Sequence, residues 1–206
     1  MGNTRIIELK AHNQMEKEIR NIQNQIRRVE DSRTVEGVAV VFNNDSVDMG
    51  FIEQIDPTAI DNDTIKNSDV FAYLDHNENR GVLARCKYGQ GSLDLWIEKD
   101  GLHYRFDAPQ TQLGDELLSY LSRGEITASS FAFTIAENGE TWTRGENGEY
   151  RRRITKIDRL FDVSPVFTPA YETTSVAKRK VEELKNVETK LDAIQKEFDD
   201  LFAANA

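Results

Sequence analysis

The stretch SLDLWIEKDGLHYRFDA, residues 92–108, constrains the fold most, because it predicts a β-hairpin. Apolar and polar residues alternate on both sides of an Asp-Gly turn, and a period of two places alternate side chains on one face of a strand. An Asp-Gly dipeptide between two alternating runs is a strong signal for a tight hairpin. The alternating apolar residues are Leu93, Leu95, Ile97, Leu102, Tyr104 and Phe106.

Other apolar runs, separated by turn-rich stretches such as NNDS and ENGE, predict that the rest of the chain is also mainly β. These runs are residues 35–42, 70–74, 129–136 and 160–168. Two segments predict helices instead. DPTAIDN, at residues 56–62, is a short candidate, and TQLGDELLSYLSRG places its leucines on one face and ends at Gly124.

The N-terminal segment is compatible with either a helix or a strand. A polar turn and a β-branched run follow it, so residues 17–30 are a candidate first arm of a hairpin. Its apolar residues, however, recur at helical spacing, and periodicity alone does not decide between the two. They are Met15, Ile19, Ile22, Ile26 and Val29.

After Val176 the composition becomes strongly charged, and a near-heptad apolar stripe predicts a helix that docks or oligomerises. The stripe consists of Leu184, Leu191, Ile194, Phe198 and Leu201.

Composition excludes several functions. The 206 residues include 36 acidic and 26 basic ones, a net charge of -10, whereas binding to nucleic acid needs clustered Lys and Arg. The basic run Arg151, Arg152 and Arg153 is interpreted as a solvated face. A single cysteine, Cys86, allows no internal disulfide and indicates a reducing compartment. The sequence shows neither a secretory signal nor a membrane span, so we expect one soluble domain plus extra segments.

Motifs for cofactor chemistry are missing: the sequence has no Gly-rich phosphate loop, CxxC pair or HExxH, so we expect no cofactor and no metal. It also lacks the GxSxG elbow of α/β-hydrolases. The segments YLDHNENRG, EITASSFAF and LFDVSPVFTPAY instead offer an imidazole, a hydroxyl and a carboxylate. Serine hydrolysis needs these three groups, because the imidazole takes the hydroxyl proton and the third group fixes the imidazole tautomer.

Each candidate also has a structural interpretation. His76 ends an apolar run, as polar residues at strand ends do, and Asp162 lies between apolar neighbours where it can simply face solvent. A serine inside a strand bonds to backbone, since an unpaired buried hydroxyl costs about 1–3 kcal/mol. Cys86 is interpreted as a small buried residue rather than a nucleophile.

Taken in order, six segments resemble the prohead protease family of tailed bacteriophages, whose fold is similar to that of the herpesvirus assemblin protease. The resemblance covers about residues 33–176. The segments are RTVEGVAVVFN, GFIEQIDPTAI, DVFAYLDHNENRGVLAR, GSLDLWIEKDGLHYRFDAP, GDELLSYLSRGEITASSFAF and LFDVSPVFTPAYETTSV.

The resemblance implies a catalytic triad. The family's base corresponds to His76, and its nucleophile is the serine directly before Phe-small-Phe, which is Ser130 and not Ser129. Assemblins use a second histidine as third member, whereas the phage branch has an acidic residue that corresponds to Asp162. Asp75, Asp158 and a water molecule stay open as alternatives for that role.

The resemblance also implies an α+β, mainly β fold: an antiparallel assemblin-like β-barrel core flanked by helices, with a C-terminal helical tail. The EIRN segment is expected to be a strand paired with VEGVAVVF. The expected organisation is an N-terminal extension at 1–15, a protease domain at 16–177 and a charged helical tail at 178–206.

As to function, the resemblance implies a serine endopeptidase of capsid assembly that cleaves scaffold or delta segments of the major capsid protein and itself. We expect it to act inside the assembling prohead in the bacterial host cytoplasm, as a homo-oligomer, with the portal as a possible further partner and without binding nucleic acid or membrane. The alternative is a non-catalytic assembly or scaffold factor of the same fold that oligomerises through its C-terminal helix.

Overall fold

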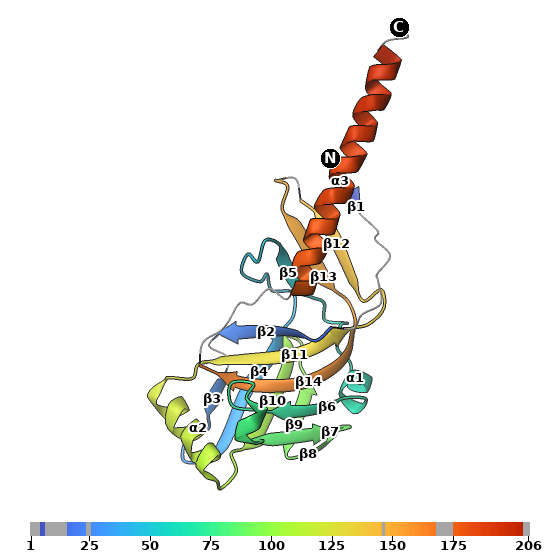
Figure 1. Cartoon of the computed structure of the whole chain (residues 1–206). Helices are drawn as coiled ribbons and strands as arrows, with labels where there is room; N and C mark the ends of the chain where they lie inside the picture. The colour runs from blue at the N-terminus through green and yellow to red at the C-terminus, as the bar shows by residue number, and fades with distance from the viewer. Residues whose placement is uncertain (1–4, 7–15, 24–25, 146, 168–174, 204–206) are drawn as a thin grey trace.

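The computed structural model describes residues 5–6, 16–23, 26–145, 147–167 and 175–203. The described strands form three sheets (Figure 1). The six-stranded sheet has the order β2 (Glu18–Gln23), β11 (Ala128–Ile135), β14 (Ile157–Val166), β6 (Asp69–Ala72), β7 (Ala84–Lys87) and β8 (Gln90–Gly91). The second sheet has the order β3 (Ile26–Arg28), β4 (Thr34–Val41), β10 (Gly101–Asp107) and β9 (Leu93–Ile97). The third has the order β1 (Arg5–Ile6), β12 (Glu140–Arg144), β13 (Tyr150–Ile154) and β5 (Ile52–Ile55).

The chain is α+β and mainly β, as predicted, but its described strands do not close into the expected barrel. Each sheet is open, with two end strands. Two pairings, β13 with β5 and β14 with β6, are parallel rather than antiparallel. The core nevertheless joins the two larger sheets, because Phe106 on β10 and Phe131 on β11 belong to one buried cluster.

The predicted hairpin is confirmed as β9 and β10, with Ile97 opposite Leu102 and Leu93 opposite Phe106. Its turn is displaced by one residue from the Asp-Gly pair, because Glu98 and Gly101 exchange backbone hydrogen bonds. Gly101 therefore does not form the turn, and its lack of a side chain instead allows β10 to pack closely against β4. A β-carbon there would lie 1.9 Å from the carbonyl oxygen of Val40 on the neighbouring strand β4.

The N-terminal segment is a strand, as the family resemblance implied, but the expected partner is wrong. β2 pairs with β11 rather than with β4, and Asn21 lies opposite Ser130. The short strand β3 makes the pairing with β4 instead, with Ile26 opposite Gly37. The β2 strand therefore lies directly beside the serine that sequence analysis singled out.

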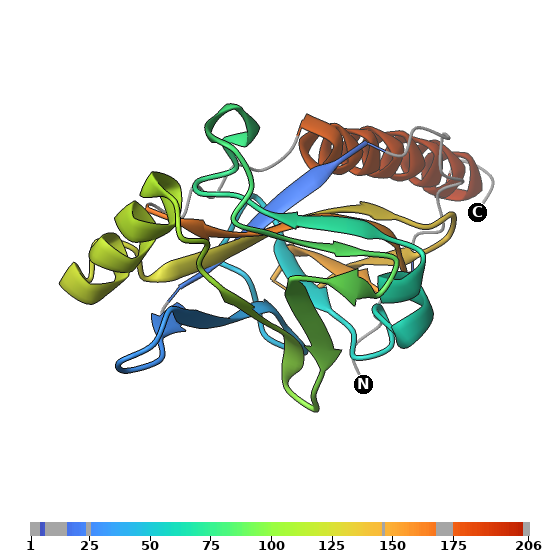
Figure 2. The same cartoon turned by 90° about the horizontal axis from the view of Figure 1, so that it is seen from below.

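The helices are α1 (Asn62–Lys66), α2 (Gln112–Arg123), α3 (Ser175–Ala203) and a 3-10 turn at Glu78–Arg80. The two short helices lie at opposite ends of the strands (Figure 2). α2 is confirmed: Thr111 caps its start, and Gly124 ends it with a φ of 71°. The helix predicted at 56–62 is displaced, because Asp61 caps α1 by accepting a hydrogen bond from the Thr64 amide.

α3 extends away from the sheets (Figure 1). Its first turns bury Val181 and Leu184 against Phe51, Trp142 and Tyr150. Within the described chain, no helix combines the length and the apolar character needed to cross a membrane.

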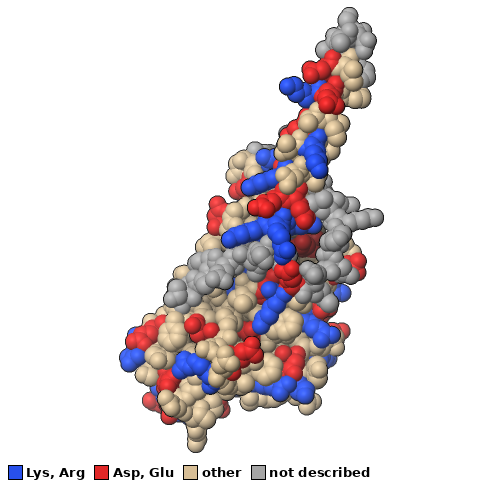
Figure 3. Space-filling model, viewed as in Figure 1, with Lys and Arg blue, Asp and Glu red and all other residues tan. Residues whose placement is uncertain are grey.

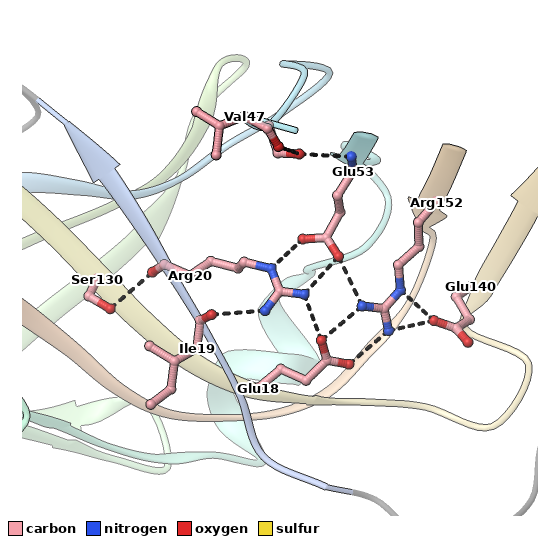
Figure 4. Close-up of polar contacts among 9 residues, drawn as sticks. Glu18, Ile19, Arg20, Val47, Glu53, Ser130, Glu140 and Arg152 are labelled. Atoms are coloured by element: carbon pink, nitrogen blue, oxygen red, sulfur yellow. Dashed lines mark hydrogen bonds and ion pairs between the residues drawn. The ribbon is translucent and has the colours of Figure 1, made fainter. Parts of the chain in front are cut away.

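The most unexpected feature is a buried ion-pair network that joins β2, β5 and β13 (Figure 4). Arg20 Nε lies 2.6 Å from Glu53 Oε1, and Arg152 Nη2 lies 2.7 Å from Glu18 Oε1. Arg152 also contacts Glu53, and its side chain is only 3% exposed, so the prediction of a solvated face is wrong for this residue. Burial opposes the charge of Glu18, but Arg152 and Arg20 lower its pKa to about 2.

Removing one cation from this network is expected to destabilise the fold. Arg152→Met leaves the Glu18 and Glu53 carboxylates buried without a full set of partners, and breaking a buried pair typically costs about 3–5 kcal/mol. The measurement is the free energy of urea-induced unfolding. Arg151→Met is the matched control, because that neighbour's side chain is 41% exposed and its pairs should contribute about 1 kcal/mol or less. Equal losses in the two variants would contradict the importance of the network.

Candidate active site

The two adjacent serines of β11 face opposite sides of the sheet, as alternation in a strand requires. The hydroxyl of Ser129 lies 2.7 Å from the Tyr104 hydroxyl, inside the core. The hydroxyl of Ser130 lies on the other face, 2.6 Å from His76 Nε2. The structure therefore places Ser130, and not Ser129, beside an imidazole.

His76 reaches Ser130 from a strained turn that follows β6. Asp75 and His76 both adopt left-handed backbone conformations, with φ values of 57° and 54°. Such conformations cost non-glycine residues about 1–3 kcal/mol each and are found at functional sites. The Asp75 amide donates to the Pro165 carbonyl (2.9 Å), which attaches the turn to β14. The turn thus directs the imidazole back over the sheet.

Asp162 comes from β14, the strand between β11 and β6 in the sheet. It lies opposite Ala132, one pleat away from the Ser130–Ser164 pair, so its carboxylate is on the same face as the Ser130 hydroxyl. Asp162 Oδ1 is 2.6 Å from His76 Nδ1. This contact is short, although its angle departs from that of an aligned hydrogen bond, as is common before substrate binds.

The electrostatics of Asp162 favour an ionised carboxylate. The residue is 1% exposed, and this burial would by itself raise its pKa, but contacts with His76, Lys17 and Ser164 lower it overall. A carboxylate beside Nδ1 favours the tautomer with the proton on that nitrogen, leaving Nε2 free to accept a proton. Nε2 is the atom that faces Ser130.

Ser130 has a second contact. Its hydroxyl lies 3.0 Å from the Arg20 carbonyl on β2. A hydroxyl has one proton, so it donates either to this carbonyl or to His76 Nε2 at a given moment. Ser130 is also completely buried.

The other candidate residues lie elsewhere. Burial raises the pKa of the Cys86 thiol, which disfavours its nucleophilic form. Asp75 is exposed, and Asp158 lies 3.7 Å from Arg159 rather than beside the imidazole. His103 bonds to Asp100 in the β9–β10 turn. His12 lies outside the described residues.

Sequence analysis missed two residues that contact Asp162. The Ser164 hydroxyl donates to Oδ1 (2.9 Å) and accepts from the Tyr73 amide (3.3 Å). Lys17 Nζ is 3.2 Å from Oδ2. The spacing of two in DVS indicates that Asp162 and Ser164 share a face, and this signal was available in the sequence. No comparable signal connects Lys17 with Asp162, because their contact depends on which strand pairs with β11.

Comparisons with known proteins found a matching family and a similar solved structure. The structure of the capsid assembly protease gp21 of bacteriophage T4 is 14% identical, with a TM-score of 0.49, covering 75% of this chain and 98% of that one. No curated protein sequence matches the chain. The family described as caudovirus prohead serine protease matches residues 20–188, a range that contains His76, Ser130 and Asp162. Because this match covers most of the chain, the chain belongs to the caudovirus prohead serine protease family.

Proposed function

We propose that this protein is a serine endopeptidase of capsid maturation that uses Ser130 as nucleophile, His76 as general base and Asp162 as the residue that orients the imidazole. The observation that supports this most is the uninterrupted chain of contacts from Ser130 Oγ through the imidazole to the Asp162 carboxylate, with 2.6 Å on each side of the ring. The same three residues lie within the matched family region.

In the proposed mechanism Ser130 Oγ attacks the scissile carbonyl while His76 Nε2 takes its proton. His76 then gives that proton to the leaving amine, and a water molecule hydrolyses the acyl-enzyme by the same route. Asp162 keeps the ring in the required tautomer and stabilises the imidazolium that forms. Because Ser130 is completely buried between His76 and the Arg20 carbonyl, the proposed mechanism requires the His76 turn or β2 to shift before a peptide carbonyl reaches Oγ.

Family membership supports capsid proteins as the substrate class. We propose the scaffold or delta segments of the major capsid protein, and the protease itself, as the substrates. The proposed place of action is the assembling prohead within the bacterial host, where the portal is a further proposed partner.

Replacing the nucleophile should abolish processing. When the chain is co-expressed with its capsid protein, Ser130→Ala should leave the capsid protein at full length, as seen on gels and by mass spectrometry. Ser129→Ala is the matched control: the same change one residue away, on the core face of β11, should leave processing intact once folding has been verified. Continued processing by Ser130→Ala would remove Ser130 from the mechanism.

Asp162→Asn should slow Ser130 reactivity by about 10³-fold or more, because an amide supports the wrong imidazole tautomer. The measurement is the rate constant for labelling by a fluorophosphonate, which needs no knowledge of the cleavage site. Asp158→Asn is the control, since that carboxylate faces Arg159. Labelling within about tenfold of the unmodified protein would assign the orienting role to another group.

A second candidate function, assembly through the tail, is supported by a specific surface. Basic and acidic side chains are interspersed along α3 (Figure 3), whereas an apolar stripe on the same helix is exposed. Its exposed members are Leu191, Ile194, Phe198 and Leu201. Their spacing of three and four is that of a coiled-coil seam, so residues 178–206 are proposed as a self-association tail appended to the protease domain at 16–177.

Disrupting this stripe should lower the oligomeric state without affecting catalysis. The double substitution Leu191→Glu and Ile194→Glu introduces charge at the proposed seam and should yield monomers in size-exclusion chromatography with light scattering. Fluorophosphonate labelling of Ser130 should be unchanged. Lys190→Glu with Asp192→Lys serves as the control that alters charge beside the seam. An unchanged mass in the double variant would remove the tail from self-association.

A further inference from the structure

The two oxygens of the Asp162 carboxylate have different partners. Oδ1 lies 2.6 Å from His76 Nδ1 and accepts a 2.9 Å hydrogen bond from Ser164. Oδ2 lies 3.2 Å from Lys17 Nζ. A carboxylate held at both oxygens cannot rotate freely about its last torsion. Lys17 therefore restrains the oxygen that points toward the imidazole by holding the other one.

The sheet register explains how a residue near the N-terminus reaches this carboxylate. Ile19, Ala132 and Asp162 form one row across β2, β11 and β14. Lys17 precedes Ile19 by two residues, so an extended chain places it on the same face. Ala132, between Ile19 and Asp162, has only a methyl group, which leaves room on this face for a longer side chain. The ammonium also lies 5.5 Å from the centre of the Phe161 ring.

The charge of Lys17 opposes protonation of the imidazole. His76 from the turn after β6, Ser164 from β14 and Lys17 from the segment before β2 all contact Asp162. Of these, Lys17 has a permanent positive charge at neutral pH. It shares the carboxylate with His76, so it weakens the attraction between Asp162 and an imidazolium.

We propose that Lys17 is a positioning residue of the active site: it fixes the Asp162 carboxylate and extends the pH range in which His76 works as a base. This inference rests on the proposed protease function. Lys17 lies outside the family match, which begins at residue 20, whereas Asp162 lies within it.

The test follows the rate constant for fluorophosphonate labelling of Ser130 against pH in the full chain, for the unmodified protein, Lys17→Met and Lys17→Arg. The acid limb is the part of this pH profile in which the rate constant falls as the pH is lowered. Lys17→Met should move the acid limb to higher pH by about 0.5 unit, the size expected for a partly exposed pair. Lys17→Arg should restore the original limb. Because the Lys17 side chain is 49% exposed, 1 M NaCl should move the limb of the unmodified protein toward that of Lys17→Met.

Lys99→Met is the matched control, because it removes the same charge from the exposed β9–β10 turn. It should leave the acid limb in place. Superimposed profiles for Lys17→Met and the unmodified protein would overturn the inference, and so would an equal shift in Lys99→Met, which would indicate a general charge effect.

A second measurement separates this inference from the proposed function. ¹⁵N NMR of the His76 ring follows its protonation without any reaction. A higher midpoint in Lys17→Met supports the inference even if the unmodified protein fails to react with the fluorophosphonate, a result that would count against the protease mechanism alone. An unchanged midpoint overturns the role of Lys17 whatever the labelling shows.

Discussion

The buried ion-pair network of Glu18, Arg20, Glu53 and Arg152 is the interaction on which the rest of the active site depends (Figure 4). The network attaches β2 to β5 and β13 of the third sheet, while β2 also pairs with β11. The carbonyl of Arg20 contacts the Ser130 hydroxyl, so a residue whose side chain belongs to the network has a backbone atom in the site. Breaking a buried charge pair is costly, so the network favours the strand arrangement in which all of its charges stay paired. Here that arrangement places the edge strand β2 beside Ser130.

The strand order of the six-stranded sheet then brings the three proposed catalytic residues together. β11 provides Ser130, β14 beside it provides Asp162, and the turn after β6 provides His76. Between Ala132 and Phe133 the register with β14 shifts, which leaves a bulge at Phe161 beside the carboxylate. Bulges next to active sites redirect side chains, and the left-handed turn at His76 has the same effect on the imidazole. Regular strand pairing brings these side chains close together, and the bulge at Phe161 and the left-handed turn at His76 orient them.

The sequence predicted those parts of the molecule that are determined locally. Alternation located β9 and β10, and the cap residues bounded α2, because hairpins and helix ends depend on neighbours in the chain. The family resemblance supplied the three residues that the structure brings together. What could not be predicted depends on distant partners. Sequence analysis did not predict β13, because three consecutive arginines show no alternation of apolar and polar residues. Arg152 can be buried there because carboxylates from other strands surround it. The pairing of β2 with β11 likewise follows from tertiary packing, and with it the contact of Lys17 with Asp162.

The residues of the site are spread over almost the whole protease region, from Lys17 near the start to Asp162 near its end. The serine and the histidine are therefore translated well before the strand that supplies the carboxylate, and β14 is also the strand to which the His76 turn is attached. A chain that ends before β14 has Ser130 and His76 but lacks Asp162 and the strand to which the His76 turn is attached. The proposed site is therefore complete only once β14 has been made and has paired with β11 and β6.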